Sequence, residues 1–219
     1  MRTPSILLAG AALAAAAFMS AGAQANLVTN GSFENGSGSA GLGGFVTLGA
    51  GNPSITGWTI GPNNIDWINN YWLASNGTHS LDMNGDSGAS AVSQTIATVA
   101  GAHYNLSFDL AGNPDLGSLK YLTVFAGATS HSYTFDSSGH DRVNMGWVGE
   151  SFGFTATGAS TLIKFQSGST DNCCWGPALD NVSVTGGVPE LATWAMMIIG
   201  FGGVALRMRR HRDSVALTA

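Results

Sequence analysis

The chain has 219 residues, of which 44% are hydrophobic and only 10% are charged, and its formal net charge at pH 7 is −5. Between residues 26 and 188, three basic residues stand against eleven acidic ones, which gives this part a net charge of −8. Such an acidic surface argues against nucleic acid and anionic lipid as partners. The same stretch is long enough for one domain with its own core, and nothing in it indicates a second domain.

The first 25 residues have the layout of a secretory signal peptide. Arg2 is followed by an apolar run from Ile6 to Met19 and by the small-residue site Ala23-Gln24-Ala25. This order predicts cleavage before Asn26 and export of the remaining chain.

The body of the chain, residues 26–187, has the composition of an exported β protein. It is rich in Gly, Ser, Thr and Asn and poor in the helix formers Lys and Glu. Strands are predicted at Gly57–Ile60, His79–Met83, Ala91–Ile96, Tyr104–Leu110, Tyr121–Ala126, His131–Phe135, Glu150–Thr155, Thr161–Gln166 and Ala178–Thr185. The clearest is Tyr104–Leu110, where apolar and polar residues alternate as in a half-buried antiparallel strand. So many short strands in one domain predict an all-β fold, a single jelly roll or β-sandwich.

Two further segments of the body are predicted to be irregular. Gly36–Gly51 contains seven glycines with little periodicity and is expected to form a long surface loop. Asp82–Asp86 begins like an EF-hand loop, but the glutamate expected at the twelfth position is absent, so a turn is predicted.

A run of aromatic and amide residues from Asp66 to Trp72 suggests a sugar site. Aromatic faces stack on the C–H surfaces of pyranose rings, while Asp and Asn side chains bind hydroxyl groups. We therefore predict glycan-binding residues at Asp66, Trp67, Asn69, Tyr71 and Trp72. The alternative is that Trp58, Trp67 and Trp147 fill the core of the sandwich and the other rings cover its rim.

The chain has two cysteines, and they are adjacent at Cys173 and Cys174. An exported protein meets an oxidising compartment, in which ordinary thiols do not persist. Three states stay open: a vicinal disulfide within an eight-membered ring, disulfides between molecules, or free or metal-bound thiols.

The sequence gives little sign of catalysis. The five histidines lack metal-ligand spacing such as His-Glu-x-x-His, and the nucleophile motif Gly-x-Ser-x-Gly is absent. A glycosidase needs two carboxylates that face each other across a cleft, and eleven acidic residues offer many pairs that sequence alone does not sort. We therefore expect a non-catalytic protein.

The last 32 residues resemble a sorting signal. A Pro-Glu motif is followed by Trp194-Ala195, an apolar stretch to Leu206 and a basic cluster. This layout resembles the PEPxxWA variant of the PEP-CTERM signal of exported proteins in Gram-negative bacteria, although Leu191 stands where that signal has its second proline. The residues that carry the resemblance are Pro189, Glu190, Trp194, Ala195, Arg207, Arg209, Arg210 and Arg212.

Physical arguments favour residues 188–212 as a single transmembrane sorting helix. Trp194–Leu206 would span roughly 20 Å as a helix, so flanking residues must help it to cross a hydrocarbon core of about 30 Å. The arginines predict a cytoplasmic tail at residues 213–219 and a body outside the membrane. The resemblance implies transient anchoring in the inner membrane, an exosortase-type processing enzyme as partner, and a final location at the cell surface or outside the cell.

The body also resembles the choice-of-anchor C family, whose domain is similar to the galactose-binding jelly rolls of carbohydrate-binding modules. The resemblance rests on Asn30-Gly31-Ser32-Phe33-Glu34, Gly57-Trp58, Ile65-Asp66, Gly77 to Asp82, Ser93-Gln94-Thr95, Tyr104 to Asn113 and Gly176 to Val184. It implies a structural calcium ion between Glu34 and Asp180, with backbone carbonyls completing the six to eight oxygen ligands that calcium takes. The alternative is that these two carboxylates only cap turns or accept hydrogen bonds from backbone amides.

Three hypotheses of different classes remain. The main expectation is an exported cell-surface or matrix protein that associates with exopolysaccharide, which the resemblance to the sorting signal implies, because bacteria with that signal are generally exopolysaccharide and biofilm producers. The alternative is a carbohydrate-binding module for a specific glycan, and a glycoside hydrolase is the third and weakest hypothesis.

Overall fold

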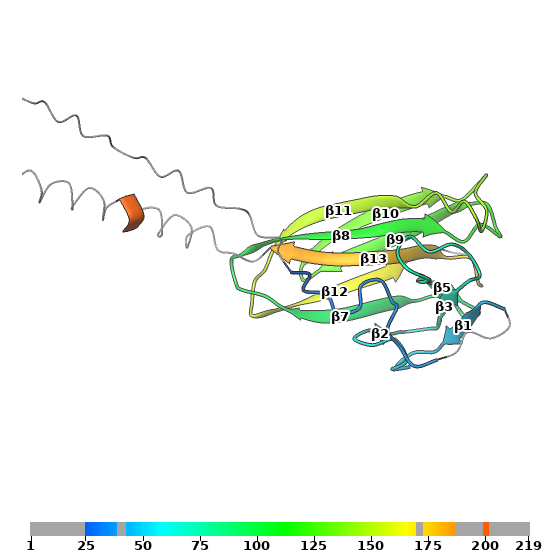
Figure 1. Cartoon of the computed structure of the whole chain (residues 1–219), viewed down its shortest axis with the longest axis horizontal. Helices are drawn as coiled ribbons and strands as arrows, with labels where there is room; N and C mark the ends of the chain where they lie inside the picture. Colours follow the sequence, from blue (N-terminus) through cyan, green and yellow to red (C-terminus); the bar gives the residue numbers. More distant parts are fainter. Residues whose placement is uncertain (1–24, 39–42, 170–172, 187–198, 202–219) are drawn as a thin grey trace, which may run out of the picture.

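The computed structural model describes residues 25–38, 43–169, 173–186 and 199–201 (Figure 1). Residues 45–186 carry the strands of a two-layered β-sandwich. The strands are β1 Phe45–Leu48, β2 Thr59–Ile60, β3 Ile65–Asn69, β4 His79–Asp82, β5 Asn84–Gly85, β6 Gly88–Ala89, β7 Ala91–Ala97, β8 His103–Gly112, β9 Leu119–Ala126, β10 Thr129–Asp136, β11 Val148–Thr155, β12 Ser160–Ser167 and β13 Pro177–Gly186.

The strands form two large antiparallel sheets and a small hairpin. The six-stranded sheet has the order β1-β3-β4-β13-β8-β11, the five-stranded sheet has the order β10-β9-β12-β7-β2, and β5 pairs with β6. The core lies between the two large sheets, where Phe108 of β8 meets Phe165 of β12 edge to face at 5.2 Å between ring centroids. The predicted all-β sandwich is therefore confirmed.

Period-two alternation explains why the predicted strands form. In β8, Leu106, Phe108 and Leu110 are buried in the core, while Asn105 and its polar neighbours face the other side of the sheet. Each of the nine predicted segments contains an observed strand, with ends that shift by a few residues. β8 extends past Leu110 because its last residues pair with the start of β13.

Strands β1 and β3 and the small hairpin were not predicted, and the prediction of an uninterrupted surface loop at Gly36–Gly51 is wrong. Phe45–Leu48 forms β1, which pairs with β3. Gly44, at φ +79°, accepts a hydrogen bond from the Asn69 amide beside the start of β1. β3 has no period-two pattern because Ile65 to Ile68 are all buried, on both faces of the sheet. The segment Asp82–Asp86, predicted to be a turn, contains the end of β4 and the strand β5 of the small hairpin.

The two ends of the domain lie side by side at one end of the sandwich (Figure 1). The side chain of Asn26 donates to the carbonyl of Val182 at 3.2 Å and accepts from the amide of Val184 at 2.9 Å. The amide of Leu27 donates to the carbonyl of Val184. Strands β1, β3 and β5 lie at the opposite end of the sandwich.

The motif Asn30-Gly31-Ser32-Phe33-Glu34 forms a tight turn that packs on β13. Asn30 and Phe33 have positive φ angles of 55° and 58°, and the Phe33 side chain is fully buried. The amide of Val182 donates to the carbonyl of Gly31 at 2.8 Å. Within this turn, Gly31 is the point of closest approach to β13.

No helix in the described residues is long and apolar enough to cross a membrane. Residues 199–201 are helical. The predicted signal peptide at 1–25 lies outside the described residues except for Ala25, and the named residues of the sorting signal all lie outside them. Both segments stay predictions.

Replacing Gly31 with alanine should destabilise the domain. A Cβ atom at this position would lie 1.9 Å from the carbonyl oxygen of Val182, so the turn would have to move away from β13. We expect urea unfolding to show a loss of about 2 kcal/mol or more in the free energy of unfolding. Gly49→Ala is the matched control, because nothing lies within 4 Å of its added Cβ. Equal losses in the two variants would contradict the close packing of the turn on β13.

Candidate functional site

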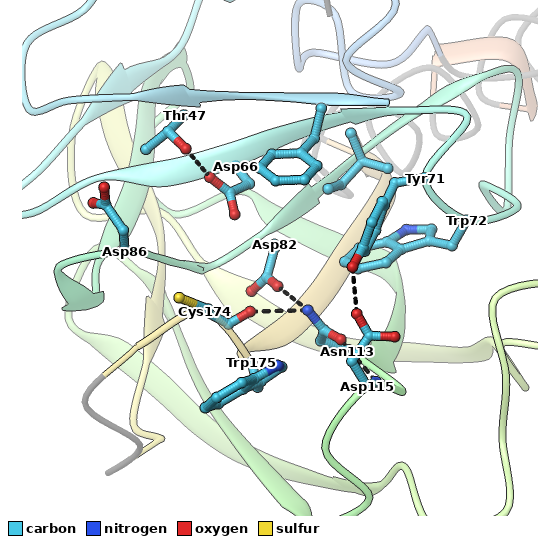
Figure 2. Close-up of a pocket in the computed structure, with 12 residues that line it drawn as sticks. Thr47, Asp66, Tyr71, Trp72, Asp82, Asp86, Asn113, Asp115, Cys174 and Trp175 are labelled. Atoms are coloured by element: carbon cyan, nitrogen blue, oxygen red, sulfur yellow. Dashed lines mark hydrogen bonds between the residues drawn. The ribbon is translucent and has the colours of Figure 1, made fainter. Parts of the chain in front are cut away.

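A pocket of about 300 Å³ lies on the six-stranded sheet, on the face opposite to the core (Figure 2). Three kinds of side chain line it: aromatic or aliphatic groups, carboxylates, and small polar groups. The lining residues are Phe45, Thr47, Asp66, Ile68, Tyr71, Trp72, Asp82, Asp86, Asn113, Asp115, Cys174 and Trp175.

The strand register builds one wall of the pocket. Thr47 of β1 is opposite Asp66 of β3, which is opposite Asp82 of β4. Because side chains directly across neighbouring strands share a face, these three form a row that lines the pocket. The Thr47 hydroxyl donates to Asp66 Oδ1 at 2.6 Å.

Asp82 is the deepest group of the pocket, and it is fully buried. Its Oδ1 accepts hydrogen bonds from the amides of Asn84, at 3.0 Å, and Gly176, at 2.9 Å, and its Oδ2 accepts from Asn113 Nδ2 at 2.8 Å. Burial raises the pKa of Asp82 to about 8; the hydrogen bonds oppose this shift and the charge of Asp66 adds to it. Burial also raises the pKa of Asp66, although its hydrogen bond from Thr47 acts in the other direction.

The opposite wall is aromatic and is held by one arginine. The ring of Tyr71 meets Phe45 edge to face at 5.1 Å and lies 5.7 Å from Trp72. The Tyr71 hydroxyl donates to Asp115 and accepts from Arg142, whose guanidinium lies 3.8 Å from the centre of the Tyr71 ring. Burial and the bond to Asp115 raise the pKa of Tyr71 to about 12, so its phenol stays protonated.

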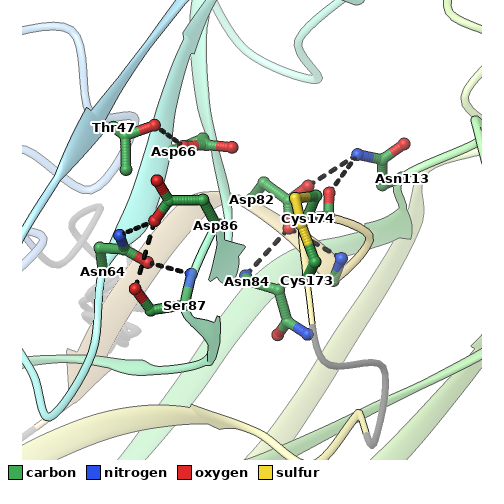
Figure 3. Close-up of a disulfide and its surroundings, with 11 residues drawn as sticks. Thr47, Asn64, Asp66, Asp82, Asn84, Asp86, Ser87, Asn113, Cys173 and Cys174 are labelled. Atoms are coloured by element: carbon green, nitrogen blue, oxygen red, sulfur yellow. Dashed lines mark hydrogen bonds between the residues drawn. A yellow bond between two sulfur atoms is a disulfide. The ribbon is translucent and has the colours of Figure 1, made fainter.

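The rim is formed by the loop that carries the two cysteines (Figure 3). In the structure Cys173 and Cys174 are joined by a disulfide, one of the three states that the sequence left open. The Cys174 amide donates to the carbonyl of Gly85 at 2.9 Å, and its carbonyl accepts from Asn113 Nδ2 at 2.8 Å. The loop is thereby fixed against the floor, and Trp175 stands at the rim with 36% of its surface exposed.

Three of the five predicted glycan-binding residues, Asp66, Tyr71 and Trp72, line this pocket. Trp67 and Asn69 do not, because they follow Asp66 and Ile68 in a strand and point to the other face. Trp67 is 3% exposed and donates from Nε1 to the carbonyl of Phe33 at 3.0 Å. Trp67 is therefore part of the core, as the alternative prediction had it.

Most of the remaining polar lining has no local signal in the sequence. Asp82, Asn113, Asp115 and Trp175 come from distant parts of the chain. Among these four residues, only Trp175 stands beside a recognisable sequence feature, because it directly follows the cysteine pair.

Glu34 and Asp180, the predicted calcium ligands, both hold the loop of residues 75–79. Glu34 Oε1 accepts from the amides of Thr78 and His79, and its Oε2 accepts from the Thr78 hydroxyl and lies 3.1 Å from His79 Nδ1. Asp180 Oδ2 accepts from the amide of Asn76 at 2.8 Å. The described residues contain no group of three or more His, Cys, Asp or Glu side chains that could hold a metal, whereas the predicted site relies on backbone carbonyls besides its two carboxylates. In the structure both carboxylates accept hydrogen bonds from backbone amides, as the alternative expected, and calcium binding stays a prediction.

Residues 26–185 match the family described as "Protein of unknown function (DUF642)". The chain belongs to the DUF642 family. This DUF642 chain is 28% identical over 162 residues to halomucin of Haloquadratum walsbyi, an alignment that spans 74% of this chain but only 2% of halomucin. The resemblances to the choice-of-anchor C family and to the PEP-CTERM signal stay predictions.

Two solved structures are similar to parts of this DUF642 chain. The carbohydrate-binding module TmCBM61, in complex with β-1,4-galactotriose, has a TM-score of 0.45 and 17% identity, over 74% of this chain and 99% of the module. The arabinose-bound α-L-arabinofuranosidase MgGH51 has a TM-score of 0.50 and 12% identity, over 76% of this chain and 27% of the enzyme. These likenesses concern the fold.

The stability of the DUF642 domain should fall as the pH rises from about 5 to about 9. The ordinary pKa of an aspartate is 3.8, whereas the pKa of Asp82 in the folded chain is about 8, so between these values the folded state binds more protons than the unfolded state. The stabilisation is complete below the lower pKa and is lost as the pH rises through the higher one. Melting temperatures measured across this range should show the decline.

Asp82→Asn removes this titration, so its melting temperature should fall less steeply over the same range. Part of the slope should remain, because burial raises the pKa of Asp180 to about 7. A slope that Asp82→Asn leaves unchanged would contradict the assignment to Asp82, whatever the variant does to overall stability.

Proposed function

We propose that the DUF642 domain of this chain is a non-catalytic module that binds a glycan in the pocket between Tyr71 and Trp175. The observation that carries the proposal is the pairing of aromatic rings with converging carboxylate and amide groups in one hollow. Sugar recognition needs this pairing, because a pyranose ring has an apolar C–H face and a rim of hydroxyl groups.

The dimensions of the pocket fit a short glycan segment. A volume of about 300 Å³ is at the lower end of the range for small-molecule sites. It suits one or two sugar rings, with the rest of the polymer outside. Trp175 at the rim offers an exposed face to a ring that enters, and the Tyr71 ring is already held in place by Arg142.

Two of the pocket carboxylates, Asp82 and Asp115, are poorly arranged for hydrolysis. Asp82 is fully buried, and both of its oxygens accept hydrogen bonds from the protein, so it has no access to a glycosidic oxygen. Partial burial raises the pKa of Asp115, but hydrogen bonds from Arg142 and Tyr71 outweigh this effect and lower the pKa below its ordinary value. A general acid needs both a raised pKa and access to the leaving group. Neither of these two residues meets both conditions, which supports binding without turnover.

The predicted export signal and sorting segment place this binding activity at the cell surface or in the extracellular matrix. The producer's own exopolysaccharide is then the first ligand to test, and an exosortase-type enzyme is the partner proposed for processing. This localisation rests on residues outside the described part of the chain and is part of the proposal.

Binding should be measured by calorimetry with the purified protein against a panel of neutral oligosaccharides and the producer's polysaccharide. The panel should include β-1,4-galactotriose. We expect at least one ligand to bind, and Trp175→Ala to weaken it about tenfold, because a stacking face is lost. Tyr121→Ala is the matched control, since its ring is 43% exposed on β9 of the other sheet. Lack of binding to every glycan would contradict the proposal, as would a loss in Tyr121→Ala alone.

Reduction of the disulfide should also weaken binding. The disulfide ring restrains the backbone beside Trp175 and keeps the Cys174 carbonyl on Asn113. We expect a mild thiol reductant, or the double change Cys173→Ser and Cys174→Ser, to lower affinity several-fold and to shift the fluorescence of the tryptophans. Binding and fluorescence that do not change on reduction would show that the loop holds its position without the bond.

A further inference from the structure

The charged residues that line the pocket are all acidic. Four carboxylates line it, those of Asp66, Asp82, Asp86 and Asp115, and none of the lining residues is Lys or Arg. The nearby guanidinium of Arg142 is occupied by Asp115, at 2.8 and 2.9 Å, and by the Tyr71 hydroxyl. No basic residue of the lining therefore compensates the carboxylate of Asp66.

Asp66 and Asp82 place two carboxyl groups in one row of the sheet. They are directly opposite each other on β3 and β4 and face the same side. Like charges in this position destabilise a sheet. Burial raises the pKa of Asp82 to about 8, and the charge of Asp66 adds to this shift, so Asp82 is mostly protonated at neutral pH and Asp66 carries the charge of the pair.

Asp66 also has an oxygen that is open to a ligand. The side chain is nine-tenths buried, and its Oδ1 is bonded by Thr47. In the described part of the chain, no group donates a hydrogen bond to its Oδ2, which points into the pocket toward Asp82 (Figure 2). A carboxylate oxygen that lines a pocket without a protein donor binds a donor strongly, and a positively charged donor most strongly.

We propose that the pocket selects glycans that carry free amino groups, with an ammonium group of the sugar bound at Asp66 Oδ2. An ammonium group brings three N–H donors and one positive charge, which compensates the carboxylate row. The aromatic rings of Tyr71 and Trp175 beside the row suit a cation attached to a sugar ring. A uronic acid would add a carboxylate to the same row and is rejected. This inference rests on the proposed glycan binding and names the class of sugar.

The test compares a positively charged sugar with two neutral sugars of the same backbone, and adds one anionic sugar of a different backbone. Calorimetry with the purified protein at a pH of about 6, below the pKa of ordinary amino groups, uses three β-1,4-linked tetrasaccharides. These are chitosan tetraose with free amines, its N-acetylated counterpart and cellotetraose, and an oligogalacturonate is the anionic member. We expect the free amine to bind about tenfold more tightly than the two neutral sugars, and the oligogalacturonate not to bind.

Asp66→Asn is the decisive variant. Its amide oxygen can still accept the Thr47 hydrogen bond, and the change removes a buried charge, so the fold is expected to persist with an undiminished melting temperature. The ratio of the free-amine affinity to the neutral-sugar affinity should fall to about twofold or less, whatever the variant does to the affinity for the neutral sugars. Asp136→Asn removes the same charge from an exposed position on β10 outside the pocket and should leave the preference intact.

The outcomes separate this inference from the proposed function. Neutral sugars that bind as tightly as the amine would overturn the inference and leave glycan binding standing, whereas no binding by any member would overturn both. Equal losses of preference in Asp66→Asn and Asp136→Asn would assign the preference to overall charge and overturn the inference. A preference that appears only with added calcium and disappears with EDTA would also overturn it, because the carboxylates would then serve a metal ion.

Discussion

The buried carboxylate of Asp82 is the contact on which the arrangement of the pocket depends. It accepts a local hydrogen bond from the amide of Asn84 and joins its own segment to two distant ones, through the amide of Gly176 and the side chain of Asn113. Gly176 has to be glycine, since a Cβ there would lie 2.5 Å from Asp82 Oδ1. Through Asn113 the same carboxylate also fixes the cysteine loop. One buried carboxyl group thus organises both the floor and the rim.

The six-stranded sheet serves two purposes with alternating residues. On one face, Trp67, Leu81 and Leu179 pack into the core as consecutive cross-strand neighbours. On the other face, the next row carries Thr47, Asp66 and Asp82 and lines the pocket. The rigidity of the packed core is therefore transmitted directly to the polar row, which holds its side chains in place before a ligand arrives.

The fold was largely predictable because its strands alternate locally, as β8 does. β3 was missed because it is buried on both faces and shows no alternation. Without the strand, Trp67 was predicted to bind sugar together with residues that face the other side of the sheet. Tyr71 and Trp72 were found because an aromatic pair beside amides is visible in a short stretch of sequence. Asp82, Asn113 and Asp115 were missed because strand pairing and loop packing, which act over long separations, bring them together. Local patterns predict elements, whereas the polar part of this site is a property of the tertiary structure.

The two ends of the domain lie next to each other, and this determines how the domain can be joined to other segments of a polypeptide. Asn26 and Leu27 are bonded to Val182 and Val184, and strands β1 and β3 lie at the far end of the sandwich (Figure 1). A chain that enters and leaves at the same point can be spliced into a longer polypeptide without disturbing the sandwich. Whatever is attached at either terminus joins the domain at the end opposite to β1 and β3, two of the strands that line the pocket. This geometry therefore suits a domain at the end of a polypeptide and a domain inserted within one equally well.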